Sequence, residues 1–268
     1  MVAMMRNPLS RLIALLALFL ALPASASYPL ISTTTIAGSG AGADAVNGLA
    51  QDASGNLYAA GYLTQGSGSD IWVAKFSPSL VLLSSYTYDK AGFSDIAWAV
   101  DVDTAGGGVF VAGVVASSAT YAGDDIWVAK FDSSLVLISS LSVNGPGNNR
   151  DVAGRLRVSG GSVYVVGRTS ETIGAASWVA RYDTNLVLLS SASLIQFEPY
   201  GFEVLPSSSG SVFAAGSRAP DAATSVDAWI GKFDSNLVLV ASAALNGSAS
   251  NTDQYHRLVD DGAGGVYA

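Results

Sequence analysis

The chain repeats one strand-like stretch, which first reads Asp70-Ile71-Trp72-Val73-Ala74-Lys75-Phe76. The same pattern returns, with small changes, at residues 125–131, 177–182 and 227–233. Its tryptophans are spaced 55, 51 and 51 residues apart. That period is typical of four-stranded propeller blades and is too long for helical or leucine-rich repeats. The stretch therefore predicts an all-β fold.

The sequence around this stretch predicts four strands in each repeat. In the first repeat, a hairpin is expected around the turn-forming segment 52–56, because Asp, Ser, Gly and Asn favour turns. The third strand covers 70–76, and a fourth follows the turn at 77–79. The third strand is apolar on both faces until its end, so its sheet has to be covered on both sides. Radial stacking of such sheets meets that need and predicts a β-propeller of four-stranded antiparallel blades.

The repeats give four complete blades and a partial fifth, so we expect an incomplete ring in a fragment of a longer protein. An N-terminal strand in 27–43 resembles a fourth strand and is expected to complete the last blade. The predicted segments are a signal peptide at 1–26, propeller repeats over 27–268 with blades at 44–94, 95–150, 151–199 and 200–252, and a partial blade at 253–268. The residues predicted to form the repeated core are Trp72, Trp127, Trp178, Trp229, Phe76, Phe131, Tyr182 and Phe233.

The N-terminus has the pattern of a secretory signal. Arg6 and Arg11 precede the apolar run 12–22, and a small-residue site ends at Ala26. This run is short for a membrane span, so we expect cleavage after Ala26 rather than an uncleaved anchor. The protein is then secreted, extracellular or periplasmic, with no membrane span after cleavage. The chain contains no cysteine, which excludes disulfides and lipid attachment through a cysteine.

Charge is sparse and acidic. Charged residues make up 13% of the chain, and the formal net charge is −8. Loss of Arg6 and Arg11 with the leader makes the chain more acidic still. An acidic surface repels phosphate backbones, which argues against a nucleic-acid partner.

The repeat resembles a known family. The stretch 125–132, together with the strand 108–113, is similar to the SBBP-type beta-propeller repeat family, and the similarity extends over residues 30–268. The resemblance implies an exported bacterial repeat protein with no shared set of catalytic residues. Two departures are Ala176, which replaces the acid before tryptophan, and the segment 205–207, which replaces a Val-Asp pair.

One set of carboxylates is a candidate site. Just ahead of each repeat's first strand the sequence has Asp44, Asp95, Asp151 and Asp253, with Tyr200 near that place in the fourth repeat. If first strands line a central channel, these carboxylates gather at one mouth and attract a cation such as calcium or a basic ligand. The alternative, which we favour, is that each aspartate accepts backbone N–H bonds in the turn between blades.

Other motifs carry less chemistry. His256 is the only histidine, which leaves no zinc triad and a weak case for a Ser-His-Asp arrangement. Asp101 begins a segment like a calcium loop, but Ala105 and Ala112 stand where ligands are needed. We therefore expect no cofactor, with calcium left open. A basic residue recurs near the end of each third strand, and we expect its aliphatic chain to lie over a blade face. These residues are Lys75, Lys130, Arg181 and Lys232.

Variable loops suggest where a partner binds. The second-to-third strand connections differ in length and are expected on one face, at 62–69, 114–124, 168–176 and 217–226. The sequence thus predicts an exported, non-catalytic interaction module or scaffold that binds a protein or glycan through this face. The alternative is a propeller-type enzyme, a hydrolase, lyase or quinone-dependent dehydrogenase, with the acidic residues at the channel mouth. A structural segment of a large adhesin also stays open.

Overall fold

The computed structural model describes residues 33–268 except 67, 121, 197–202, 220–225 and 247–252. The chain divides into two units, Met1–Thr33 and Thr34–Ala268, and the second contains every strand described below. The predicted signal peptide at 1–26 lies outside the described residues. Across the described part of the chain, no helix is long and apolar enough to cross a membrane.

Unit Thr34–Ala268 is built from β-strands, with no helix among the described residues. Four sheets have four strands each, every strand pairs antiparallel with its neighbour, and the strands follow chain order within each sheet. The first two blades are β1 (Ala45–Gln51), β2 (Leu57–Gln65), β3 (Gly68–Phe76) and β4 (Leu82–Tyr88), then β5 (Ile96–Val102), β6 (Val109–Val115), β7 (Asp125–Phe131) and β8 (Leu137–Val143).

The remaining strands repeat this plan. They are β9 (Val152–Ser159), β10 (Ser162–Ser170), β11 (Ala175–Asp183) and β12 (Leu188–Gln196), then β13 (Glu203–Pro206), β14 (Val212–Arg218), β15 (Asp227–Phe233) and β16 (Leu239–Leu245), and the hairpin β17 (Val259–Asp260) and β18 (Val266–Tyr267). The prediction of four complete blades and a partial fifth is confirmed.

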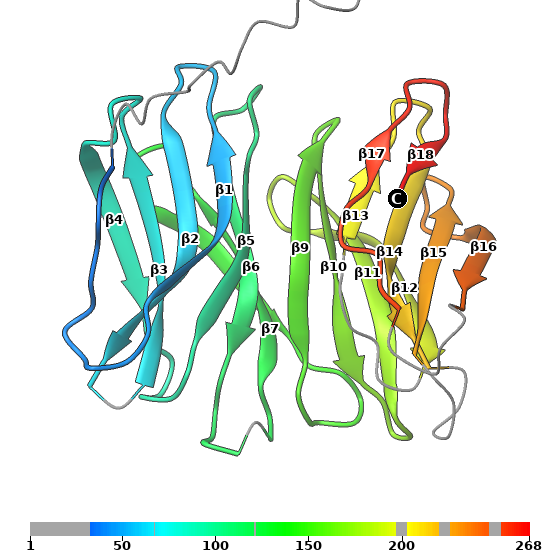
Figure 1. Cartoon of the computed structure of the whole chain (residues 1–268), viewed down its shortest axis with the longest axis horizontal. Helices are drawn as coiled ribbons and strands as arrows, with labels where there is room; N and C mark the ends of the chain where they lie inside the picture. The colour runs from blue at the N-terminus through cyan, green and yellow to red at the C-terminus, as the bar shows by residue number, and fades with distance from the viewer. Residues whose placement is uncertain (1–32, 67, 121, 197–202, 220–225, 247–252) are drawn as a thin grey trace, which may run out of the picture. The chain divides into compact units, whose positions relative to one another are not determined.

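Successive blades pack face to face (Figure 1). The first strands meet, because β1 contacts β5, β5 contacts β9, and β9 contacts β13. One apolar cluster fills each junction. Between the first two blades, Tyr58 and Val73 pack with Val111, Trp127 and Phe131. Burial of apolar sheet faces at each junction holds the blades together, as the two-sided apolar pattern requires.

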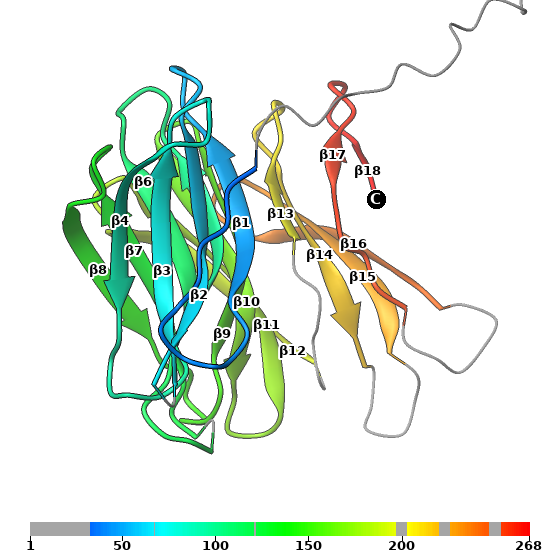
Figure 2. The ribbon, with the colours of Figure 1, turned by 60° about the vertical axis from the view of Figure 1, so that its left-hand side comes forward.

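The fifth repeat continues the series beside the fourth blade (Figure 2). Leu258 and Val266 pack against Phe213 and Ala215 of β14. The described strands do not close into a ring. At the other end, residues 34–44 belong to no strand, and Ile36 packs on the face of the first blade that no other blade covers. The predicted N-terminal strand at 27–43 lies partly outside the described residues.

A bulge interrupts the first strand of the first three blades at the same point. The extra residues are Asn47, Trp98 and Gly154. The facing residue of the second strand is always glycine, because a Cβ on Gly113 would collide with the backbone carbonyl of Ile96. Bulges redirect a side chain away from the regular ladder. Here they fall on the strands that line the junction of the blades.

Candidate functional site

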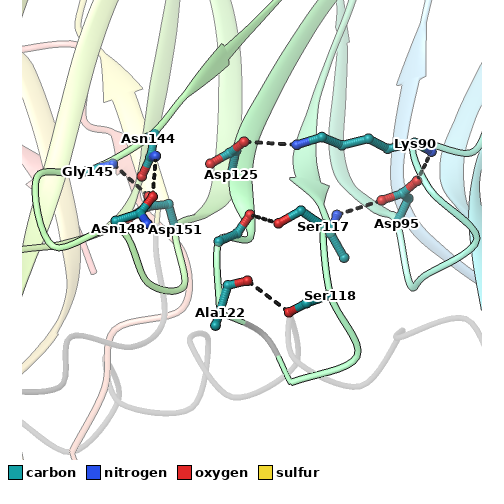
Figure 3. A network of polar contacts seen from close by, with 12 residues as sticks. Lys90, Asp95, Ser117, Ser118, Ala122, Asp125, Asn144, Gly145, Asn148 and Asp151 are labelled. Atoms are coloured by element: carbon teal, nitrogen blue, oxygen red, sulfur yellow. Dashed lines mark hydrogen bonds and ion pairs between the residues drawn. The ribbon is translucent and has the colours of Figure 1, made fainter.

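The predicted aspartates lie at the turns between blades and bind backbone. Asp95 is fully buried, and its two carboxylate oxygens accept hydrogen bonds from the N–H groups of Ala116 (2.7 Å) and Lys90 (2.6 Å) (Figure 3). Asp151, also fully buried, accepts in the same way from Gly145 and Ser170. Each carboxylate thereby ties the loop before its own blade to a loop of that blade.

The first repeat follows this pattern, and in the fifth repeat Asp253 makes a contact through its own backbone N–H. Asp44 accepts from the N–H groups of Gly38 (2.9 Å) and Thr64 (2.7 Å). The N–H of Asp253 donates to the carbonyl of Val226 (2.8 Å), as that of Asp151 does to Asp124. Tyr200, the predicted counterpart in the fourth repeat, lies outside the described residues. Within the part of the chain that the structure describes, no three acidic or histidine side chains come together to hold a metal ion.

Two more carboxylates belong to this region, that of Asp125 (Figure 3) and that of Asp124, whose backbone carbonyl accepts from Asp151. Asp125 pairs with Lys90 at 2.9 Å, and Asp124 lies 3.7 Å from Nε of Arg150. Burial raises the pKa of Asp124 to about 6, although the Arg150 charge opposes the shift. Burial also raises the pKa values of Asp95 and Asp151, whereas backbone hydrogen bonds hold the pKa of the less buried Asp44 below its usual value.

The other predicted residues have structural surroundings. His256 is exposed on the fifth repeat. The eight predicted core residues are all buried. The basic side chains near the ends of the third strands lie over aromatic rings of the second strands. For example, Nζ of Lys75 is 5.3 Å from the ring centre of Tyr58. Lys75 also donates to the carbonyl of Ser133 in the next blade (2.8 Å), so it joins two blades as well as covering one.

The predicted variable loops are shorter than expected in two repeats. Strand β2 extends to Gln65 and β3 begins at Gly68, which leaves a tight turn in place of the loop 62–69. Likewise β10 extends to Ser170 and β11 begins at Ala175. In the second repeat, by contrast, the segment between Val115 and Asp125 is a true loop, in which Ser117 and Ser118 donate to backbone carbonyls.

A different site lies where the first strands meet. A polar cavity of about 140 Å³ is open there between β1, β5 and β9 and the fifth repeat. We call it the axial cavity, because first strands face the centre of a propeller. Its lining residues are Asn47, Gly48, Leu49, Trp98, Ala99, Val100, Arg155, Arg157 and Arg257. Asn47 and Trp98 are the extra residues of the bulges in β1 and β5.

The three arginines of the axial cavity share one carboxylate, that of Glu203 on β13. Arg257 Nη1 lies 3.1 Å from Oε2, Arg157 Nη2 lies 3.3 Å from Oε1, and Arg155 Nε lies 3.9 Å from Oε2. The Glu203 side chain is 1% exposed, whereas that of Arg257 is 62% exposed. Glu203 is thus a buried counterion that positions three cationic groups facing the cavity.

The polar atoms of this cluster are not fully satisfied by the described residues. Arg155 Nε and the indole Nε1 of Trp98 are buried, and neither has a hydrogen-bond partner in the described part of the chain. Burial lowers the pKa of Arg155, and the nearby charge of Arg257 lowers it further. Buried donors of this kind are costly unless a water or a ligand accepts from them. The axial cavity is therefore the candidate binding site.

Sequence reasoning missed Trp98, Arg155, Arg157, Glu203 and Arg257. A signal was present, because Arg155, Glu203 and Arg257 are spaced 48 and 54 residues apart, close to the repeat period. Arg155 follows the bulge of β9, Glu203 begins β13, and Arg257 precedes β17. An alignment of the repeats on their first strands, rather than on the tryptophan stretches, would have shown that these charged residues recur at similar positions.

A larger apolar cavity of about 430 Å³ lies on the uncovered face of the first blade. Ile36, Leu63, Trp72 and Phe76 contribute to its lining. Equivalent tryptophan surfaces of the later blades are buried against the preceding blade. It is therefore a packing surface, and the axial cavity is the better candidate for polar chemistry.

Comparison with known proteins supports the fold. No protein-family model matches the chain, and no curated protein matches it. Among solved structures, the unit is similar to an α-L-arabinofuranosidase of Fusarium graminearum, with a TM-score of 0.50 and 10% identity over 75% of this chain and 66% of that one. It also matches the hydrazine synthase of Kuenenia stuttgartiensis, with a TM-score of 0.47 and 9% identity over 82% of this chain and 71% of that one.

A third match is the β-fructofuranosidase BmSUC1 of Bombyx mori, with a TM-score of 0.43 and 11% identity over 81% of this chain and 52% of that one. The chain thus spans between half and about seven-tenths of these three chains. The prediction of a non-catalytic interaction module has to be corrected on these findings, because propeller enzymes are prominent among the matches. We take up the enzyme alternative as a proposal below. At such low identity the likeness itself establishes the β-propeller fold alone.

Proposed function

We propose that the chain is part of a propeller-type hydrolase that acts on glycosidic bonds, with the axial cavity as its substrate site. The observation that carries this proposal is the set of groups around that cavity. It combines the half-buried indole of Trp98, the amide of Asn47 and a cluster of guanidinium groups. A flat aromatic face can cover the C–H groups of a sugar, while amide and guanidinium N–H groups donate to its oxygens.

The comparisons add support of a general kind. The arabinofuranosidase that shares the fold was solved in complex with an iminosugar inhibitor, as a mutant in which a glutamate is replaced by alanine. Pockets of propeller and barrel folds commonly lie where the strands converge. A sugar-sized ligand at the axial cavity is consistent with both points.

The location of the acidic groups differs from the sequence-based expectation of acids at a channel mouth. Asp95 and Asp151 are occupied by backbone N–H donors, so we give them no role in substrate chemistry. Glu203 contacts the cavity arginines and acts as a positioning residue. Substrate binding in this proposal rests on Trp98, Asn47 and the arginines.

The test is hydrolysis of a panel of 4-nitrophenyl glycosides, including the α-L-arabinofuranoside, by the full chain. We expect release of 4-nitrophenol by the wild type and a fall of at least about tenfold in kcat/KM for Trp98→Ala. The Lys90→Gln variant is the control, because it removes a charge at the turns between blades and leaves the cavity unchanged. An inactive wild type, or a Trp98→Ala variant as active as the wild type, would contradict the proposal.

We also propose that the protein is exported and belongs with the SBBP-type repeats. The basic start, apolar run and small-residue site at 1–26 support export. The repeated stretch that forms each third strand supports membership of the family. Detection of the mature chain beginning at Ser27 by N-terminal sequencing of exported material would test the first of these.

A further inference from the structure

The axial cavity carries an excess of positive charge. Arg155 and Arg157 come from β9 and Arg257 from the fifth repeat, yet one carboxylate, that of Glu203, pairs with all of them. The cluster thus has more cationic groups than anionic ones in an otherwise acidic chain, whose formal net charge is −8. Like charges held together cost free energy unless an anion compensates them.

The hydrogen-bond donors are also in excess. Each guanidinium carries more N–H donors than Glu203 has oxygens to offer. Arg257 Nη1 donates to Glu203 and to the carbonyl of His256, and Arg155 Nη1 donates to the carbonyls of Trp98 and Gly154 at 3.5 and 3.4 Å. The backbone contacts of Arg155 Nη1 are long, and its Nε lies 3.9 Å from Glu203 Oε2 with no hydrogen-bond partner among the described residues, which leaves donor capacity at the wall of the cavity. Guanidinium forks match oxyanions such as carboxylate and sulfate.

We propose that the axial cavity binds a sugar that carries an oxyanion, a carboxylate or a sulfate, and that Arg155, Arg157 and Arg257 recognise this group. The inference rests on the proposed glycoside hydrolase function for the sugar and on the arginine cluster for the charge. Trp98 then covers the sugar ring, and Glu203 keeps the guanidinium groups in place without neutralising them. The ligand supplies the missing negative charge.

The experiment compares ligands that differ only at carbon 6. Isothermal titration of the full chain with glucose, glucuronate and glucose 6-sulfate, and with the corresponding galactose series, separates the ring from its anionic group. We expect an anionic member of one series to bind at least about tenfold more tightly than its neutral parent, the size of a charge-assisted contact. The carboxylate and sulfate arms identify which oxyanion is preferred.

Variants locate the contact. Arg157→Gln and Arg257→Gln are expected to remove the preference for the anionic sugar, while Arg257→Lys keeps part of it and Lys90→Gln keeps all of it. These two arginines are chosen because their side chains are 39% and 62% exposed, so the fold does not depend on their burial. For the wild type alone, rising NaCl should weaken binding of the anionic sugar and leave that of a neutral sugar unchanged.

The outcomes separate this inference from the proposed function. Tight binding of an anionic sugar without hydrolysis of any glycoside would support the inference and overturn the hydrolase. Hydrolysis of neutral glycosides with equal binding of neutral and anionic sugars would support the hydrolase and overturn the inference. Equal affinity of the wild type and the Arg157→Gln variant for the anionic sugar would also overturn it.

Discussion

Arg257 of the fifth repeat and Glu203 of the fourth blade form an ion pair with Nη1 and Oε2 3.1 Å apart. Both residues stand four positions before the residue that opens the hairpin turn of their repeat, Ser207 and Asp261, so the pair joins equivalent positions of successive repeats. Arg155 and Arg157 of the third blade reach the same carboxylate. One buried side chain therefore links three successive repeats.

Replacement of Glu203 by Gln should destabilise the protein. The variant removes the carboxylate that three guanidinium groups share, and it leaves those charges close together without a counterion. Loss of one partner of a buried ion pair typically lowers the free energy of unfolding by about 3 kcal/mol or more. The loss should be smaller here, because the arginines reach solvent. We expect a loss of about 2 kcal/mol in the free energy of unfolding by urea denaturation. An unchanged midpoint would show that the cluster contributes nothing to the fold.

Asp95→Asn should also destabilise, through hydrogen bonds rather than charge. Both oxygens of Asp95 accept from backbone N–H groups, and an amide offers only one acceptor oxygen. One buried N–H then loses its partner, at a cost of about 1–3 kcal/mol. Asp44→Asn is the matched control, because Asp44 makes the same two contacts at a partly exposed site where water can replace one. Equal losses in the two variants would contradict this account.

The pH dependence of stability should contain a contribution from Asp124. Its pKa in the folded protein is about 6, above the ordinary value of 3.8, so the folded state binds the proton more tightly than the unfolded state. Between about pH 4 and pH 6, stability from this group falls as the pH rises, and above that range the loss is complete. Asp124→Asn should therefore gain stability relative to the wild type as the pH is raised from 4 to 7. Thermal unfolding of both proteins across this range measures the difference, and a constant difference would refute the prediction.

The order of strands in a blade could be predicted from sequence, because every repeat contains the same pattern of strands and turns. The stretch around Trp127 is apolar on both faces, and in the structure its strand β7 is buried on both. The paired turn residues likewise mark where strands end. These are local patterns, and each blade tests the same one again.

The axial cavity could not be predicted in this way. Arg155, Glu203 and Arg257 are far apart in sequence and meet only because successive blades place their first strands side by side. Bulges then redirect Asn47 and Trp98, and a one-residue change in register is not visible in composition or spacing. The carboxylates of three of the aspartates ahead of the first strands accept backbone N–H bonds, which is the contact that the favoured alternative describes.

The fourth strands show another limit of hydrophobic patterning. Val136, Leu137 and Ile138 read as a buried strand, yet all three are exposed. Val136 precedes β8, the outermost strand of the blade, and the other two begin it, where no further strand of the described chain covers them. The residue before them, Leu135, is buried instead. The same alternation recurs in the third and fourth blades, where Leu186 and Leu237 are buried and the aliphatic side chains after them are exposed.

Leu135 combines this burial with a left-handed backbone, and that combination is testable. Its φ is 65°, and Leu80 in the first blade has a φ of 61° at the equivalent turn. Glycine adopts this conformation without the cost of about 1 kcal/mol that a side chain incurs. Leu135 lies in the cluster between the first two blades, whereas Leu80 is only partly buried. Leu135→Gly should therefore lose about 2–4 kcal/mol, since a buried leucine is worth more than the relieved strain. Leu80→Gly should lose less than half as much, because it gains the same relief and gives up less burial. If urea denaturation shows equal losses, backbone conformation rather than packing between blades decides the stability of these turns.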